Sequence, residues 1–480
     1  MPARRPRLVP VSAHDELVAS LAQLRRDLEL PTAFPPDAEA EAERASRDVS
    51  VDPSAAQLDD LRDVEFLTID PAGSTDLDQA LHLERTATGA VLHYAIADLP
   101  AFVAPGGAVD EEARRRGQTL YAADGRLPLH PVALSEGTAS LLPGRDRRAF
   151  VWRFVLDDEA RPVETTLRRA VIRSRKQWSY ADAQAALDAR TAPSALEALA
   201  WFGALRLERE AERGGASLNV PETRIVADDG GYRLERAAPP AVEEWNAQVS
   251  LLTGMAAADI MLRGGVGILR TMPAAEPDDI AAFRRQTVAL GIPWASGVAY
   301  GDYLRGLDRD APAALAILDA AAGLFRGAGY VVFDGAPPED PVQAAIGAPY
   351  THTTAPLRRL VDRWSLVICE AIANGREIPQ WAREGLPSLP KIMARSDGLA
   401  NRLDAATLDR VEAALLTGRE GRVFEAVVLG RREDGARVQL TDPPVAAKVA
   451  GLDTAPGETV RLRLTRVDIA TGAVVLEPTA

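Results

Sequence analysis

The chain has 480 residues, 47% hydrophobic and 26% charged, a globular composition that excludes a largely disordered protein. Its formal charge of −14 argues against a uniformly basic surface that coats duplex DNA, although a single arginine-lined groove remains compatible with it. The one cysteine, Cys369, excludes an intrachain disulfide and a zinc site built on paired thiolates. No apolar run is long enough to span a bilayer, and the first residues lack the apolar core of a secretory signal, so we expect a cytoplasmic protein without a membrane segment.

Residues 1–58 are predicted to form a small helical module. Leu17, Leu21, Leu24 and Leu28 recur at spacings of three and four, which is the period of one helix face. Residues 36–70 then carry eleven acidic residues against three arginines, so much of the net negative charge lies there. A helix-turn-helix arrangement is one form that this module could take.

Residues 59–385 are predicted to form a large α+β domain. Strand-like runs and turns begin near residue 62, a mainly helical stretch covers about 178–330, and a long helix is expected from about 355 to 373. Residues 386–417 are expected to be a helical connection. From residue 418 to 480, short strands separated by regularly spaced turn signals predict a small antiparallel barrel.

The sharpest chemical feature is the segment TIDPAGSTDLDQA, in which Asp70 ends an apolar strand and Asp76 and Asp78 follow in a turn. Carboxylates held close together repel one another unless a cation neutralises them. Oxygen ligands of this kind suit Mg²⁺ or Mn²⁺. The alternative is a solvated acidic turn, because Asp and Ser are common in turns for local reasons.

A second feature is the segment YTHTTAPLRRLVDRW, where Thr353 or Thr354 can cap a helix and Arg358 and Arg359 follow at once. Cations in the first helical turn oppose the macrodipole, so an anion is expected nearby. Free backbone N–H groups at a helix start make a phosphate a suitable anion. The alternative is a salt bridge to a local acid such as Asp362.

Tyr121 and Tyr180 are candidates for stacking on nucleic-acid bases, because aromatic residues are few in this chain. The alternative for either tyrosine is packing in the core. His352, beside the arginine pair, is a candidate substrate contact, although an isolated histidine is more often a hydrogen-bonded structural residue. The sequence contains no Ser/His/Asp set, P-loop or dinucleotide-binding glycine pattern.

Taken in order, these motifs resemble those of the RNase II/RNase R family of processive 3′-to-5′ exoribonucleases. The resemblance runs from about residue 62 to 385, through YAIADLPAFVAPGGAVDEEARRRGQTLY, RLPLHPVALSEGTASLLPGRDRRA, VIRSRKQWSYADAQ and YTHTTAPLRRLVDR. It implies an α+β catalytic (RNB) domain at 59–385 and an RNA-binding OB-fold at 418–480. The family's two cold-shock domains are absent, and the helical module of 1–58 stands in their place.

The resemblance also implies roles for individual residues. Asp70, Asp76 and Asp78 fall on three of the family's four active-site aspartates, and Gln79 stands in place of the fourth as a neutral ligand. Arg358 falls on the arginine that contacts the scissile phosphate, so we expect Asp78 and Arg358 to be catalytic. The RNA contacts expected from the resemblance and the motifs are Tyr121, Tyr180, His352, Arg359 and Asp404.

The implied activity is hydrolysis of single-stranded RNA to nucleoside 5′-monophosphates by a monomer, assisted by two Mg²⁺ ions about 4 Å apart, with Mn²⁺ as the alternative metal. Two other hypotheses stay open. In one, Gln79 has weakened catalysis and left an RNA-binding protein. In the other, the chain is mainly a regulator that docks through residues 1–58, and any nuclease activity is incidental.

Overall fold

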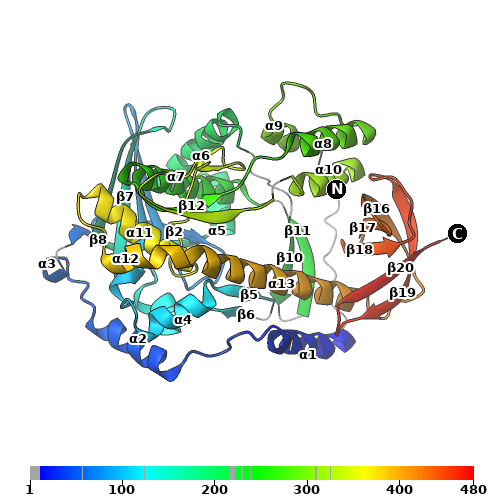
Figure 1. The fold of residues 1–480 in the computed structure, drawn as a ribbon, viewed down its shortest axis with the longest axis horizontal. Helices are drawn as coiled ribbons and strands as arrows, with labels where there is room; N and C mark the ends of the chain where they lie inside the picture. Colours follow the sequence, from blue (N-terminus) through cyan, green and yellow to red (C-terminus); the bar gives the residue numbers. More distant parts are fainter. Residues whose placement is uncertain are drawn as a thin grey trace.

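The computed structural model describes residues 11–56, 58–123, 125–215, 222–228, 231–237, 239–308, 311–324 and 326–479. Within these residues the chain forms a large α+β domain, a helical insertion that projects from it, and a small β-barrel near the carboxyl terminus (Figure 1). The predicted α+β multidomain class is confirmed. Every helix in the described residues is too short or too polar to cross a lipid bilayer.

A seven-stranded mixed sheet forms the core of the large domain, with the strand order β1-β8-β7-β4-β3-β2-β9. Its strands are β1 (Asp59–Leu61), β2 (Leu67–Asp70), β3 (Gln79–Thr86), β4 (Gly89–Ala97), β7 (Asp146–Leu156), β8 (Pro162–Arg173) and β9 (Lys176–Ser179). Strand β9 runs parallel to β2, and Asp70 and Ser179 are paired at the ends of these two strands. The end of β2 therefore lies beside the start of the segment that follows β9.

Helices cover both faces of this sheet. Those packed in the larger core are α5 (Tyr180–Asp188), α6 (Ser194–Glu212), α7 (Ala241–Gly264) and α11 (Leu360–Ala373). The elements that contribute to the second core are α4 (Ala108–Arg116), η1 (Leu99–Ala101) and the irregular turn η2 (Ala133–Thr138). Along β4, Leu92 and Tyr94 pack in the first core and Ala95 packs in the second, as the alternation of strand side chains requires.

Small hairpins lie outside the main sheet. They are β5 (Leu120–Ala122) with β6 (Gly125–Leu127), β10 (Glu222–Asp228) with β11 (Gly231–Ala237), and β14 (Val342–Gln343) with β15 (Ala348–Pro349). The β5–β6 hairpin matters for the site, because Tyr121 is its central residue on one strand.

A helical insertion separates strands β12 (Val266–Thr271) and β13 (Gly329–Asp334), which pair antiparallel. The insertion contains α8 (Pro277–Ala289), α9 (Tyr300–Arg305) and α10 (Pro312–Ala322). Phe283, Tyr303 and Ile317 belong to a hydrophobic cluster that these helices form among themselves. The insertion is therefore a small packed unit that the β12–β13 pair ties to the large domain.

Helix α13 (Leu389–Leu416) connects the large domain to the barrel, after α12 (Gln380–Gly385) and η3 (Leu386–Ser388). The barrel strands are β16 (Val423–Arg432), β17 (Gly435–Leu440), β18 (Ala446–Ala450), β19 (Thr459–Asp468) and β20 (Ala473–Pro478), in the order β18-β17-β16-β19-β20. Because β18 and β20 also lie against each other, the sheet curls into a near-barrel that is consistent with the predicted OB-fold.

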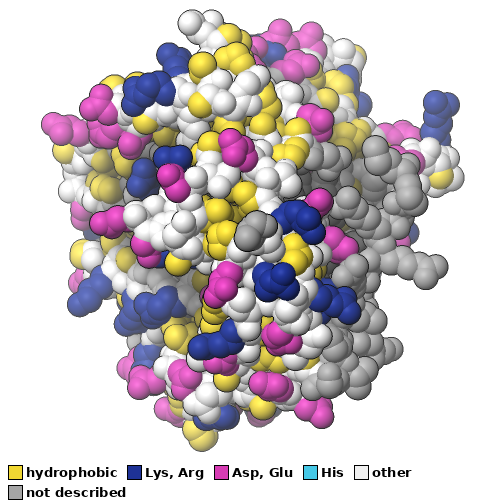
Figure 2. Space-filling model, turned by 90° about the vertical axis from the view of Figure 1, so that its right-hand side faces the viewer, with side chains coloured by type: hydrophobic (Ala, Val, Ile, Leu, Met, Phe, Trp, Pro, Cys, Tyr) yellow, Lys and Arg dark blue, Asp and Glu magenta, His cyan; other side chains and the backbone are white. Residues whose placement is uncertain are grey.

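The barrel also touches the helical insertion. Helix α10 packs on β16, and Arg437 of β17 pairs with Asp319 of α10 at 2.5 Å. Figure 2 views the barrel end of the molecule and shows positive and negative side chains interspersed over its described part. The described part of this face is therefore not uniformly basic.

The amino-terminal helices α1 (Val11–Asp27), α2 (Pro36–Asp48) and α3 (Pro53–Ala56) run along one side of the molecule (Figure 1). Helix α1 packs on α13 and the barrel, where the Ser20 hydroxyl donates to the Ile469 carbonyl at 3.0 Å and accepts from Arg410 Nε at 3.0 Å. Helix α2 instead packs on α4 and η2 with Ala38 and Ala42. Residues 1–10 of the predicted module lie outside the described residues.

Helices α1 and α2 thus pack against different parts of the molecule. A helix-turn-helix unit needs two helices packed together, and this is not the arrangement of α1 and α2. The predicted helices are present, but they extend along the side of the molecule and do not form a compact module. Each helix buries its apolar face on a distant part of the chain, and sequence periodicity cannot indicate that partner.

Candidate functional site

The predicted aspartates lie at one end of the central sheet, around the turn that joins β2 to β3. Asp70 is the last residue of β2, and Asp78 immediately precedes β3. Ser140 supports the turn, because its hydroxyl makes hydrogen bonds of 2.9 and 2.7 Å to the turn backbone. Asp76, in the same turn, interacts electrostatically with Asp70.

Asp70 has a buried Oδ2 with no hydrogen-bond partner among the described residues. Burial raises the pKa of Asp70 to about 6, the Arg358 charge lowers it, and the Asp76 charge raises it further. A buried carboxylate oxygen without a partner is costly, and Mg²⁺ prefers ligands of this kind. Asp70 therefore fits the predicted metal-ligand role by its chemistry.

Asp78 is 1% exposed and is paired with Arg358. Its Oδ2 accepts a hydrogen bond from Arg358 Nε at 2.8 Å, and its Oδ1 accepts one from the Leu357 N–H at 2.7 Å. Burial raises the pKa of Asp78 to about 7, while Arg358 and the Leu357 N–H lower it. The Arg358 side chain is 38% exposed, so it is partly accessible to solvent beside the aspartates.

Both arginines of the second motif precede α11, which begins at Leu360, so the predicted helix start near residue 355 is wrong. The N–H groups of Leu357 and Ala355 are bound by the carboxylates of Asp78 and Asp362, both at 2.7 Å, which holds this segment as a turn. Arg359 pairs with Asp362 through two hydrogen bonds of 2.9 Å. The local salt bridge considered above therefore applies to Arg359, whereas Arg358 reaches the aspartates.

Asp76 faces an arginine that no sequence motif predicts as part of the site. Arg126 in β6 donates hydrogen bonds to Asp76 Oδ1 and to Thr75 Oγ1, and it pairs with Glu136 at 2.9 Å. In the part of the chain that the structure describes, no three Asp, Glu, His or Cys side chains form a ready-made metal site. The carboxylates of Asp76 and Asp78 are instead turned toward arginines.

Gln79 begins β3 and joins it to the loop that carries Arg358. Its Nε2 donates a hydrogen bond to the Thr354 carbonyl at 2.5 Å. An aspartate could not make this contact, because a carboxylate has no N–H to donate. Gln79 therefore has a structural partner of its own, in addition to the ligand role expected from its position.

The two tyrosines lie at the edge of the aspartate cluster. Tyr121 is 49% exposed and interacts electrostatically with Arg358, so packing in the core does not describe it. Tyr180 begins α5, packs partly against the main core, and interacts electrostatically with Asp70.

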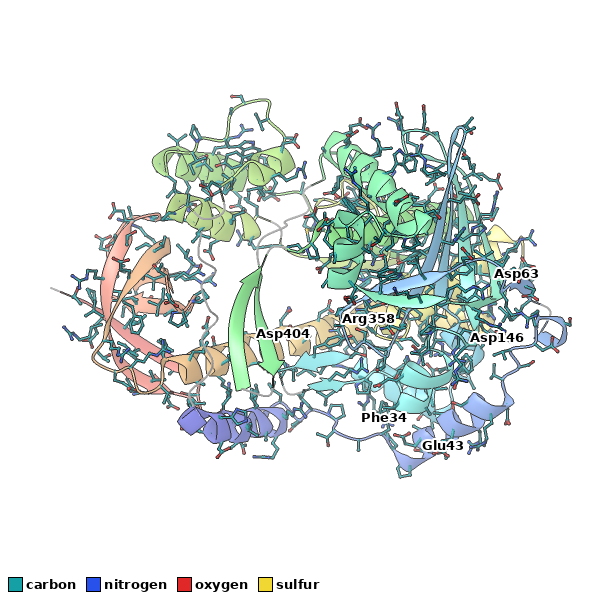
Figure 3. The ribbon with its side chains drawn as sticks, turned by 180° about the vertical axis from the view of Figure 1, so that it is seen from behind. Phe34, Glu43, Asp63, Asp146, Arg358 and Asp404 are labelled. Atoms are coloured by element: carbon teal, nitrogen blue, oxygen red, sulfur yellow. The ribbon has the colours of Figure 1, made fainter. Side chains whose placement is uncertain are left out.

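His352 and Asp404 are placed differently from these residues. His352 Nδ1 is hydrogen-bonded to the Tyr330 hydroxyl at 2.6 Å, and burial lowers the pKa of His352 well below its usual value. These contacts match the structural alternative for His352. Asp404 is exposed on α13, and Figure 3 shows it along that helix, apart from Arg358. Its predicted RNA contact stays a prediction.

Comparison with known proteins gives the family. An RNB domain model matches residues 58–372, and a model of the RNase II-type exonuclease C-terminal S1 domain matches residues 422–479. The Mus musculus protein named exosome complex exonuclease RRP44 is 28% identical over 320 residues, which cover 63% of this chain and 33% of that protein. The chain thus spans about a third of the length of the first curated relatives that it matches.

Solved structures share the fold at low sequence identity. The apo form of Mycoplasma genitalium RNase R has a TM-score of 0.86 and 18% identity, with coverage of 97% of this chain and 78% of that one. Yeast Ssd1, described as a pseudonuclease, has a TM-score of 0.67 and 17% identity, with coverage of 86% and 54%. The RNB match covers more than half of the chain and carries the aspartate turn and both tyrosines. This chain therefore belongs to the RNB-domain family and carries an S1 domain of the RNase II type.

Proposed function

We propose that this protein is a processive 3′-to-5′ exoribonuclease that hydrolyses single-stranded RNA to nucleoside 5′-monophosphates with Mg²⁺, or with Mn²⁺ in its place. The observation that carries the proposal is the Asp70 carboxylate beside the Asp78–Arg358 pair, because its buried Oδ2 has no hydrogen-bond partner among the described residues. Relatives named as exonucleases support it, as does a neighbouring RNase R structure in complex with ribose methylated single-stranded RNA.

Each side chain of the site has a part in this proposal. Asp70, Asp76 and Asp78 would hold the metal, which when bound supplies an activated water and stabilises the leaving 3′ oxygen. Arg358, oriented by Asp78, binds the scissile phosphate and offsets the negative charge that builds on it. The exposed ring of Tyr121 stacks on the terminal base, a contact worth about 1–3 kcal/mol.

A second candidate is an RNA-binding protein with little catalysis. It is favoured by Gln79, whose amide is neutral and already bound to the Thr354 carbonyl. The structural resemblance to a protein described as a pseudonuclease is compatible with it. In this case the tyrosines and Arg358 would still bind RNA, but hydrolysis would be negligible.

Digestion of a 5′-labelled single-stranded RNA with Mg²⁺ tests the proposal, with RNA binding measured on the same samples. The variants are Asp78→Asn and, as a matched control, Asp146→Asn. Asp146 is also paired with arginines, but it begins β7 outside the cluster and lies away from Arg358 in Figure 3.

We expect the wild type and the control to shorten the RNA from its 3′ end, and the Asp78→Asn variant to bind RNA without cutting it. If the wild type binds RNA but does not cut it, the exonuclease proposal fails and the second candidate replaces it. If Asp78→Asn cuts as fast as the control, Asp78 is not catalytic.

A further inference from the structure

The β5–β6 hairpin places two functional side chains on one face. Tyr121 and Arg126 are directly opposite each other in its antiparallel register. The side chains of opposite residues in such a pair project from the same side of the strands, with their Cβ atoms about 5 Å apart. The hairpin therefore presents the tyrosine and the arginine together.

Both side chains reach the aspartate cluster. Tyr121 interacts electrostatically with Arg358, which is itself bound to Asp78. Arg126 binds Asp76 and Glu136. The position of the hairpin thus sets where the exposed ring of Tyr121 lies relative to two of the carboxylates.

The other face of the hairpin is apolar and is covered by the amino-terminal segment and α13. Leu120 and Leu127, the next opposite pair, form a buried cluster with Leu24, Leu30 and Leu403. Leu24 lies in α1, and Leu30 lies in the chain that leads from α1 to α2.

Arg116 fastens this stretch of the amino-terminal segment to the hairpin region. Its Nη2 donates to the Ala33 carbonyl at 2.7 Å, its Nη1 donates to the Pro128 carbonyl at 3.1 Å, and its guanidinium lies 3.7 Å from the Phe34 ring centre. Arg116 therefore links the amino-terminal segment to the residue that follows β6.

We propose that the amino-terminal segment around Leu24 and Leu30 is a brace that holds the β5–β6 hairpin, so that Tyr121 and Arg126 stay aligned with the aspartate cluster. Leu24 and Leu30 are positioning residues in this proposal, because they act through the hairpin and do not touch the site. The role in RNA binding rests on the proposed function, whereas the bracing of the hairpin does not.

Helix α1 offers a matched control for the brace. Leu21 and Leu24 are leucines of the same helix and are 2% and 5% exposed, but Leu21 packs in the barrel cluster and Leu24 packs in the hairpin cluster. The variants are therefore Leu24→Ala, Leu21→Ala and the conservative Leu24→Met, which restores most of the side-chain volume.

The first measurement is amide hydrogen exchange over residues 120–127 of the free protein. We expect Leu24→Ala to speed exchange in the hairpin about tenfold or more, because a buried leucine is lost beneath it. Leu21→Ala should leave the hairpin unchanged, and Leu24→Met should restore slow exchange. Equal exchange in Leu24→Ala and the wild type, or equal acceleration by both alanine variants, would overturn the proposal.

The second measurement is binding of a single-stranded RNA with a fluorescent 3′-terminal base, in EDTA so that no cutting occurs. Leu24→Ala should reduce the stacking signal and weaken binding by up to about tenfold, which corresponds to the smaller estimates for one stacked base. Under turnover it should raise KM more than it lowers kcat. A wild type that gives no stacking would contradict the proposed RNA contact of Tyr121, while the exchange measurement would still decide the brace.

Discussion

Replacing Gln79 by aspartate would supply the acidic residue that the family resemblance implies at this position, and Gln79→Asn is the matched neutral variant, because asparagine and aspartate have the same length. Gln79 Nε2 donates to the Thr354 carbonyl at 2.5 Å, and Thr354 is only 4% exposed. Both substitutions shorten the side chain and remove this hydrogen bond. Leaving a buried acceptor unsatisfied costs about 1–3 kcal/mol of unfolding free energy.

Adding a metal should change the free energy of unfolding of the two variants by different amounts. In EDTA we expect Gln79→Asp to be less stable than Gln79→Asn, because its carboxylate is repelled by Asp78 and other members of the cluster. With Mg²⁺ the order should reverse, since a ligand that binds the folded state stabilises it in proportion to RT ln(1 + [L]/Kd). The added carboxylate should tighten metal binding, and the asparagine should not.

Urea unfolding in EDTA and over a range of Mg²⁺ concentrations measures this, with RNA digestion on the same samples. Activity that rises in Gln79→Asp and not in Gln79→Asn would show that the neutral residue limits metal binding in the wild type. Equal shifts of the unfolding midpoints of both variants by Mg²⁺ would refute a metal-ligand role for residue 79. Wild-type stability of both variants in EDTA would refute the stabilising role of the Gln79 hydrogen bond.

Three further predictions concern the supports of the site. Burial raises the pKa of Asp70 to about 6, so the folded state holds this proton more tightly than the unfolded chain. Its contribution to stability should therefore fall as the pH rises from about 4 to about 6, and urea unfolding in EDTA should show a weaker pH dependence in Asp70→Asn. Arg363 pairs with Asp110 at 2.6 Å with both side chains 1% exposed, and Arg114 still pairs with Asp110 at 3.3 Å once Arg363 is removed. Arg363→Met should therefore cost about 1.5–3 kcal/mol in the same assay, and a cost below 1 kcal/mol would contradict a stabilising role for the buried pair. Ser179→Ala should cost about 0.5–2 kcal/mol, because the Ser179 hydroxyl accepts the Asp182 N–H at 3.0 Å at the start of α5, and Ser179→Thr, which keeps the hydroxyl, should retain most of that stability.

The parts of the site that could be predicted from the sequence are those built by neighbouring residues. Asp70, Asp76 and Asp78 lie within one turn, so an apolar strand followed by turn residues was enough to bring them to one end of a sheet. The barrel and the large α+β domain were likewise predicted from local period and from the family resemblance, and the fold confirms both.

The parts that could not be predicted depend on distant partners. Gln79 binds a carbonyl 275 positions away, and no pattern around Gln79 indicates Thr354. The start of α11 could not be predicted, because the Asp78 and Asp362 carboxylates bind the N–H groups of Leu357 and Ala355 and hold this segment as a turn. Arg126 was overlooked because its role appears only when the hairpin places it opposite Tyr121.

The contact between α1 and the barrel has a consequence for the order in which the protein assembles. Ser20 meets Ile469 across 449 positions of sequence and Arg410 across 390. During synthesis helix α1 emerges well before the barrel strands that bury Leu17 and Leu21. Contacts of such long range form slowly, because the intervening chain must be closed before they stabilise anything. Docking of α1 is therefore expected to be the closing step of folding, and a chain whose barrel fails to form would keep that apolar helix face open to chaperones and proteases.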